Sequence, residues 1–199
     1  MSKIDKWRKW SKSICHDSGN MILSMEMFLA IQQMVNKNLP MQSEDYFYTY
    51  LNDTYLAHVV MMLRKHAKTR HIGDVSISLC KPNKSRDNSI SLAVLGQELL
   101  DHPDQIPTSF DSQQFQMKLD YFKACAKKVE GFADRVIAHS DKRPPDYVPT
   151  YTEVHEAIAA MDSLAVQCHM VLGDSQMVTC KPVIQGGWLS VFEDMGIQI

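Results

Sequence analysis

The chain is poor in the residues that make tight turns, with 8 glycines and 8 prolines among its 199 residues. An all-β protein turns sharply after every short strand, so this scarcity argues against that architecture. The richest apolar run, residues 21–34, is interrupted by four polar residues, which excludes a transmembrane helix there. The charged start MSKIDKWRKW leads into no apolar stretch, so we expect no signal peptide.

The motifs of the common enzyme and metal-binding classes are also missing. The five cysteines (Cys15, Cys80, Cys125, Cys168 and Cys180) form no CxxC pair and cannot all be paired. This argues against a secreted disulfide framework and favours reduced thiols in the cytoplasm. The eight histidines form no HExxH motif, and the Gly186-Gly187 pair begins no phosphate-binding loop. We therefore expect no metal or other cofactor.

Methionine is unusually abundant, with 13 residues, seven of them between residues 21 and 62. This unbranched residue is compatible with helices and fills apolar surfaces, so its abundance favours an α-helical fold. Apolar residues recur three or four positions apart along most of the chain, as in amphipathic helices. The periodicity predicts helices over residues 4–14, 21–35, 43–68, 91–100, 109–139 and 150–172.

Local signals give the expected boundaries of these helices. Asp17, Ser18 and Gly19 indicate a break between the first two helices, and residues 73–88 are expected to form a loop or a short strand. Thr150 followed by Glu153 is the pattern of a capping box, and Gly173 is suited to end that helix.

The sequence therefore predicts one all-α domain over residues 1–199, a bundle of four to five main helices. The expected parts are an N-terminal helix over 3–15, a core over about 20–172 and an irregular C-terminal strap over 174–199.

Charge is unevenly distributed, although the net charge is only −2. One basic stretch, residues 60–90, contains Arg64, Arg70 and Arg86, and a second, residues 118–143, contains Lys128, Lys142 and Arg143. If the two stretches adjoin in space, they form a cationic surface able to hold a phosphate backbone. The alternative is a solvated helix face followed by a lysine-rich loop.

His139 is the main candidate for a catalytic residue. It lies on the apolar stripe at the C-terminal end of the expected 109–139 helix, with Arg135 one turn earlier and Asp141 two residues later. A histidine beside a cation that holds phosphate is the minimum for metal-free RNA cleavage by an attacking 2′-hydroxyl. The alternative is a structural histidine that caps the carbonyl groups of its own helix.

The segment FADRVIAHSD, residues 132–141, resembles the signature of the HEPN superfamily, and more narrowly its AbiU-like abortive-infection branch. Three further stretches fit that branch: residues 55–63, 85–95 and 188–192. The resemblance covers roughly residues 20–195. It implies a helical bundle, often a homodimer with its two histidine motifs near the symmetry axis. It further implies a metal-independent ribonuclease or RNA-binding effector of phage defence, with an antitoxin or nucleotidyltransferase as a further partner.

The motif departs from the family pattern in the position of its arginine. The family has four to six residues between arginine and histidine, whereas Arg135 is separated from His139 by three. Ala133 and Asp134 occupy the matching positions, and a shift of two residues turns a side chain about 200° around a helix. Either Arg135 acts from another angle, another base such as Lys128 or Arg143 replaces it, or catalysis is lost. Two hypotheses therefore stand: a HEPN-type ribonuclease or RNA-binding effector, and a non-catalytic dimeric interaction module.

Overall fold

The computed structural model describes residues 2–38, 46–68, 90–133, 147–173, 176–183, 187–194 and 197, without the side chains of Phe47 and Val191. The described residues are mainly helical and contain no strand, which confirms the predicted all-α class. The helices are α1 (Lys3–Lys37), α2 (Tyr46–Ala67), α3 (Leu92–Asp101), α4 (Ser112–Phe132), α5 (Tyr151–Val171) and α6 (Ser190–Asp194), with a 3₁₀ turn at Pro103–Gln105. None of the described helices is both long and apolar enough to cross a bilayer.

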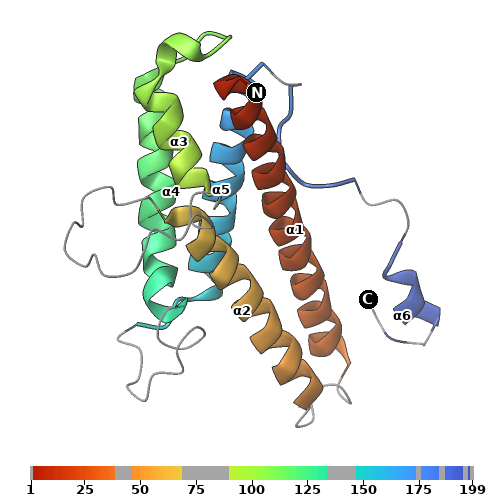
Figure 1. Ribbon diagram of the computed structural model, residues 1–199. Coiled ribbons are helices and arrows are strands. Elements are labelled where there is room, and N and C mark those ends of the chain that lie inside the picture. Colours follow the sequence, from red (N-terminus) through yellow and green to blue (C-terminus); the bar gives the residue numbers. More distant parts are fainter. Residues whose placement is uncertain are drawn as a thin grey trace, which may run out of the picture.

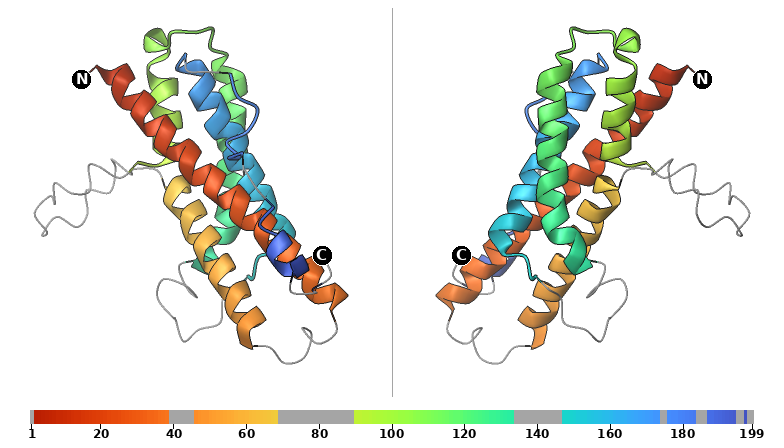
Figure 2. Two further views of the ribbon diagram at one scale, coloured as in Figure 1. Left: turned by 90° about the vertical axis from the view of Figure 1, so that its right-hand side faces the viewer. Right: turned by 90° about the vertical axis from the view of Figure 1, so that its left-hand side faces the viewer.

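Four columns of helix form the bundle (Figures 1 and 2). In the view of Figure 1, α1 runs downwards, α2 upwards, α4 downwards and α5 upwards, and the short α3 stands above the end of α2. The helices α1, α2, α4 and α5 contact one another around the bundle, and α3 packs on α1, α4 and α5. The second column is therefore made of two helices, α2 and α3.

Three helix ends carry local capping signals, two of which, at Thr150 and Gly173, were expected from the sequence. The Ser91 hydroxyl accepts a hydrogen bond from the Val94 N–H and so caps α3. Thr150 and Glu153 form the predicted capping box at the start of α5. Gly173 follows α5 with a φ of 74°, a left-handed conformation that favours glycine.

The core lies along the bundle axis and draws on every column. Its largest fully buried side chains include Trp7, Ile14 and Met21 of α1, Leu63 of α2, Leu92, Leu95 and Leu99 of α3, Phe115, Leu119 and Phe122 of α4, and Ile158 of α5. Full burial of one such side chain contributes about 1.5–3 kcal/mol to folding. Met21 and Met34 are also buried, so at least part of the methionine cluster belongs to the core.

The predicted break at residues 17–19 is wrong, because α1 continues through it as one helix of 35 residues. The N-terminal helix expected over 3–15 is thus the first half of α1. Asp17 and Ser18 are bound to residues of other elements, and a Cβ built on Gly19 would lie 2.5 Å from the backbone oxygen of Cys180. These three residues therefore serve packing across the bundle and not the termination of a helix.

Within the predicted strap over 174–199, residues 176–183 are irregular, with Cys180 bound to α5 and close to Gly19 of α1, whereas Ser190–Asp194 form the short helix α6. Helix α6 stands beside the lower half of α1 in Figure 1. Helix α4 is described as far as Phe132, and the remainder of the helix predicted to reach residue 139 lies outside the described residues.

Candidate functional site

Most of the residues predicted from sequence to act on RNA lie outside the described part of the chain. This holds for His139, Arg135 and Asp141, and for the predicted phosphate-binding residues Arg70, Arg86, Lys142 and Arg143. The described helices place the two ends of the segment that carries His139: α4 ends before it, and α5 begins after it, at the lower end of the bundle in Figure 1. Of the predicted residues, Arg64 and Lys128 are described.

Lys128 lies on the outer seam between α4 and α5, among carboxylates. Its Nζ is 3.7 Å from an oxygen of Glu153 and 3.9 Å from one of Glu156. The Tyr147 hydroxyl also binds Glu153, and together with the Thr150 backbone N–H it lowers the pKa of that carboxyl to about 2. Glu153 is therefore ionised at neutral pH. Lys128 consequently faces negative charge within its own bundle.

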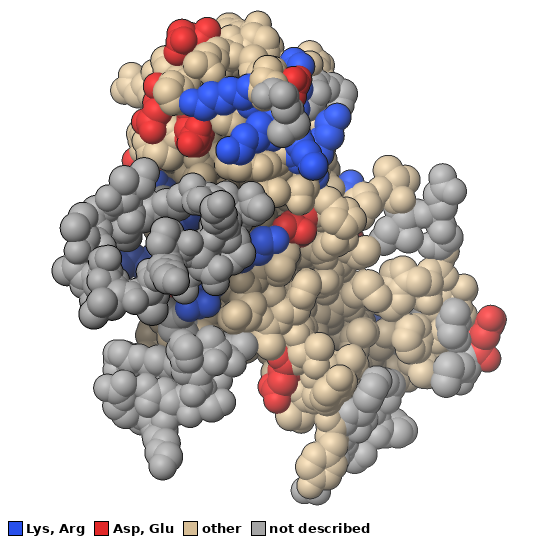
Figure 3. Space-filling view, viewed as in Figure 1, with Lys and Arg blue, Asp and Glu red and all other residues tan. Residues whose placement is uncertain are grey.

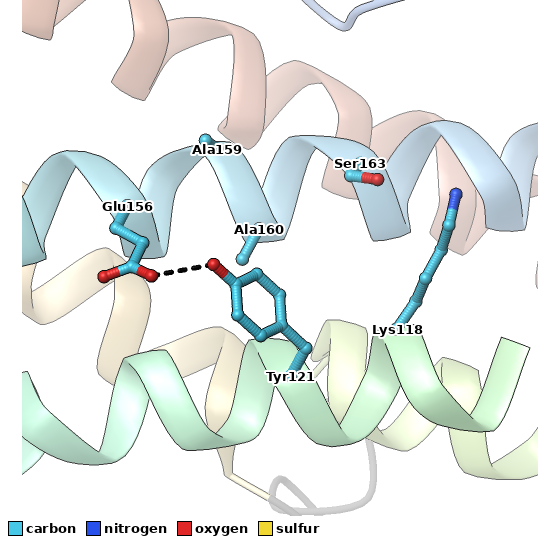
Figure 4. A pocket seen from close by; sticks show the side chains of 6 residues that line it. All are labelled: Lys118, Tyr121, Glu156, Ala159, Ala160 and Ser163. Atoms are coloured by element: carbon cyan, nitrogen blue, oxygen red, sulfur yellow. Dashed lines mark hydrogen bonds between the residues drawn. The ribbon is translucent and has the colours of Figure 1, made fainter. Parts of the chain in front are cut away.

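A shallow hollow of about 190 Å³ continues this seam (Figure 4). The Tyr121 hydroxyl donates a hydrogen bond of 2.8 Å to Glu156, and this bond raises the pKa of the phenol to about 12. Lys118, at the other end of the hollow, binds the side-chain oxygen of Gln167 at 3.1 Å. Two basic residues of the 118–143 stretch are thus engaged with α5, which makes this seam a poor surface for phosphate.

Arg64 lies in the last turn of α2, where a second polar cluster joins α2 to the middle of α1. An oxygen of Asp17 accepts hydrogen bonds from Lys65 at 2.8 Å and from His66 at 3.1 Å. These two donors lower the pKa of Asp17 to about 2, His66 contributing most. The imidazole of His66 is fully buried, and burial lowers its pKa despite the carboxylate. His66 is therefore neutral at neutral pH and donates its Nε2 proton to Asp17.

The cluster has one unusual feature, since the other ring nitrogen of His66 is buried and has no hydrogen-bond partner among the described residues. A neutral imidazole that donates through Nε2 has an acceptor at Nδ1, and leaving it unpaired costs free energy. The Asp17 carboxylate nevertheless binds both Lys65 and His66 of α2, so it fixes the position along α1 at which α2 ends. We assign this cluster a structural role.

The first half of α1 carries a further charged surface, which the sequence analysis did not single out. Residues 3–12 contain five basic residues and one acidic residue, Asp5. Two of the basic residues are engaged: Lys3 pairs with Glu98 at 3.4 Å, and Arg8 binds the backbone oxygen of Leu172 at 3.0 Å. The remaining three are Lys6, Lys9 and Lys12, which we call the α1 basic face.

The lysines of the α1 basic face are exposed, and none of them forms an ion pair with a carboxylate of the described residues. Among the described residues, every ion pair uses Lys3, Lys65, His66, Lys128 or Lys181 as its cation. In Figure 3, basic side chains gather over the upper part of the molecule, where the first half of α1 lies, with acidic ones mainly along one edge. The buried Trp10 ring lies 4.5 Å from Lys6 Nζ and supports that ammonium group at the surface.

Lysines of this kind can bind a polyanion. They sit on a rigid helix, one turn apart, and a phosphate that binds them displaces no internal carboxylate. The sequence signal was the spacing of basic residues at 6, 9 and 12, interleaved with tryptophans that turn to the core. By contrast, no group of three or more histidine, cysteine, aspartate or glutamate residues within the described ranges is placed to hold a metal ion. Comparisons of this chain with protein-family models, curated proteins and solved structures find no match.

Proposed function

We propose that this protein is a cytoplasmic, HEPN-like helical bundle that binds RNA in bacterial defence, with the α1 basic face as its main binding surface. The observation that carries the proposal is the set of three exposed lysines that form no ion pair within the described part of the chain, in a protein whose net charge is −2. A protein that is nearly neutral overall gains affinity for nucleic acid through a local concentration of cations, because phosphate contacts release condensed counterions.

In this proposal, RNA cleavage belongs to His139, with Arg135 and Asp141 beside it, and is a separate property. The α1 basic face lies near the start of α1, whereas the segment with His139 follows the end of α4 at the opposite end of the bundle (Figures 1 and 2). The 21 residues of α4 span about 30 Å at about 1.5 Å per residue. A substitution at one end therefore leaves the other end intact, so binding and cleavage can be tested independently.

Binding is tested with labelled single-stranded RNA and two matched double variants, followed by fluorescence anisotropy. Lys9→Gln with Lys12→Gln removes two charges from the α1 basic face, and Lys123→Gln with Lys127→Gln removes two from α4. We expect the first pair to weaken binding at least tenfold at low salt and the second to change it less than threefold. Equal effects of both pairs would mean that binding is a property of net charge alone. In parallel, DNA and anionic vesicles test whether the surface prefers RNA.

Cleavage is tested in a chelating buffer with the wild type and His139→Ala. The proposal expects RNA to be degraded by the wild type and to remain intact with His139→Ala, while the affinity for RNA is unchanged. Intact RNA with the wild type would restrict the protein to binding. Loss of folding in the variant is detected by its thermal unfolding curve.

The second candidate function is a non-catalytic dimeric interaction module, and one observation favours it. An apolar groove of about 330 Å³ opens between α1 and α2, lined by Met27, Phe28, Ile31, Leu51 and Tyr55 among others. Tyr46 and Tyr50, on the same end of α2, are 91% and 65% exposed. A second copy of the chain would cover such a surface. Light scattering of the wild type and Met27→Glu tests this: the module predicts a dimer that the variant dissociates, and a monomeric wild type excludes it.

A further inference from the structure

Among the described residues, the strap over residues 176–183 is bound to the bundle at Cys180 and Lys181. The Cys180 N–H donates a hydrogen bond of 2.8 Å to Asp162 of α5, whose same oxygen also accepts from the Ser18 hydroxyl at 3.2 Å. One residue further on, Lys181 forms an ion pair of 2.6 Å with Glu26 of α1. The strap is thus bound to α1 and α5 next to Cys180, and Figure 2 shows it passing along both helices.

The place of this crossing brings two thiols together. Gly19 allows the backbone of Cys180 to approach α1, since a Cβ there would lie 2.5 Å from the Cys180 oxygen. Cys15 lies one turn before Gly19 on the same side of α1, and its sulfur is 3.8 Å from the backbone oxygen of Ala165 on α5. Ala165 is in turn one turn beyond Asp162, the residue that binds Cys180. Both cysteines are half-buried and pack against the core.

We propose that Cys15 and Cys180 form a reversible disulfide, which fastens the strap to α1. In the reduced form the strap depends on the bonds at Asp162 and Glu26. In the oxidised form a covalent bond joins it to the bundle. Because the cytoplasm keeps thiols reduced, the bond forms when the cell meets an oxidant and is lost when reductant returns.

The reaction needs a disulfide of low molecular weight as oxidant, such as oxidised glutathione. The Cys15 thiolate attacks one sulfur of the oxidant, forms a mixed disulfide and releases one thiol. The Cys180 sulfur, after giving its proton to solvent, attacks the Cys15 sulfur and releases the second thiol. Two electrons pass from the two cysteines to the oxidant. A hydrogen bond with the Cys15 thiol, burial and the nearby Asp162 raise the pKa of the Cys180 thiol, so Cys180 has to lose its proton before it attacks.

A third thiol provides the matched control. Cys168 of α5 is fully buried, and burial together with Cys15 raises its pKa, so it is near Cys15 but protected from the oxidant. The Cys15→Ser, Cys180→Ser and Cys168→Ser variants each remove one thiol with almost no change in shape.

The experiment treats the full-length protein with oxidised glutathione and maps disulfide-linked peptides by mass spectrometry without reduction. We expect a linked pair containing Cys15 and Cys180 in the wild type and in Cys168→Ser, and its absence in the other two variants. We also expect the melting temperature of the oxidised wild type to rise by roughly 5–15 °C, and to fall back with dithiothreitol. A link from Cys15 to Cys168, glutathione adducts alone, or no oxidation would overturn the proposal. The wild-type peptide map decides the question even if a serine variant does not fold.

Discussion

Replacing Gly19 by alanine has two opposing effects on the stability of the fold. Gly19 lies inside α1, where alanine is the better helix former by about 1 kcal/mol. The added Cβ, however, would lie 2.5 Å from the Cys180 oxygen and 3.2 Å from the Cδ of Pro182. The first contact is far too short for a carbon and a backbone oxygen, so the strap has to move away from α1.

Displacing the strap breaks the bonds that hold it. The hydrogen bond from the Cys180 N–H to the Asp162 carboxylate contributes about 1.5–3 kcal/mol, and the exposed ion pair between Lys181 and Glu26 contributes about 0–1 kcal/mol. After about 1 kcal/mol is subtracted for the gain in helix propensity, Gly19→Ala should lower the free energy of unfolding by about 0.5–3 kcal/mol. For a chain of this size that corresponds to a fall in melting temperature of roughly 1–12 °C.

Gly131 supplies the matched control, because it lies in α4 and nothing is within 4 Å of a Cβ placed there. Gly131→Ala should therefore stabilise the protein by about 0.5–1 kcal/mol. Urea unfolding measures both variants, and hydrogen exchange at the Cys180 amide reports strap release, expected only for Gly19→Ala. If Gly19→Ala stabilises the protein as much as Gly131→Ala does, the strap does not press on α1 as described.

Three further predictions concern single polar side chains of the bundle. The ordinary pKa of Asp17 is 3.8 and its pKa in the folded protein is about 2, so the ionised carboxylate stabilises the fold above pH 4, and this stabilisation is lost as the pH falls towards 2. Asp17→Asn should therefore make the free energy of unfolding less dependent on pH over that range. An acid unfolding curve that the substitution leaves unchanged would refute this. Ser91→Ala removes the cap of α3 and should cost about 1–2 kcal/mol in urea unfolding, with Ser91→Thr retaining most of it. Tyr55→Phe loses the hydrogen bond of 3.1 Å to His155 and should lower stability by about 1 kcal/mol; no change in melting temperature would mean that this bond adds nothing.

The helix ends could be predicted from sequence because their signals are local. Thr150 with Glu153 and Gly173 act on backbone groups a few residues away, and the structure confirms both predictions. The helix break predicted at residues 17–19 was wrong for the opposite reason. Its polar and small residues contact Asp162, His66 and Cys180, which are distant in sequence. The local sequence shows none of these contacts and contains only residues that disfavour a helix.

The same distinction applies to the candidate site. The basic residues at 6, 9 and 12 are visible in the sequence, but whether carboxylates oppose them depends on which helices pack beside α1. Lys128 illustrates the other outcome, since its carboxylate partners are contributed by α5 and were not apparent from the sequence. The catalytic role of His139 rests on the resemblance and on its position along the chain, and it stays a prediction.

The central claim, that the α1 basic face binds RNA, is tested most directly by the salt dependence of binding. The logarithm of the affinity for single-stranded RNA falls with the logarithm of the salt concentration, with a slope of about −0.7 for each phosphate neutralised. Removing Lys9 and Lys12 should therefore make the slope shallower by about 1.4, while the Lys123 and Lys127 pair should leave it unchanged. An identical slope for the wild type and the Lys9→Gln, Lys12→Gln variant would contradict the claim.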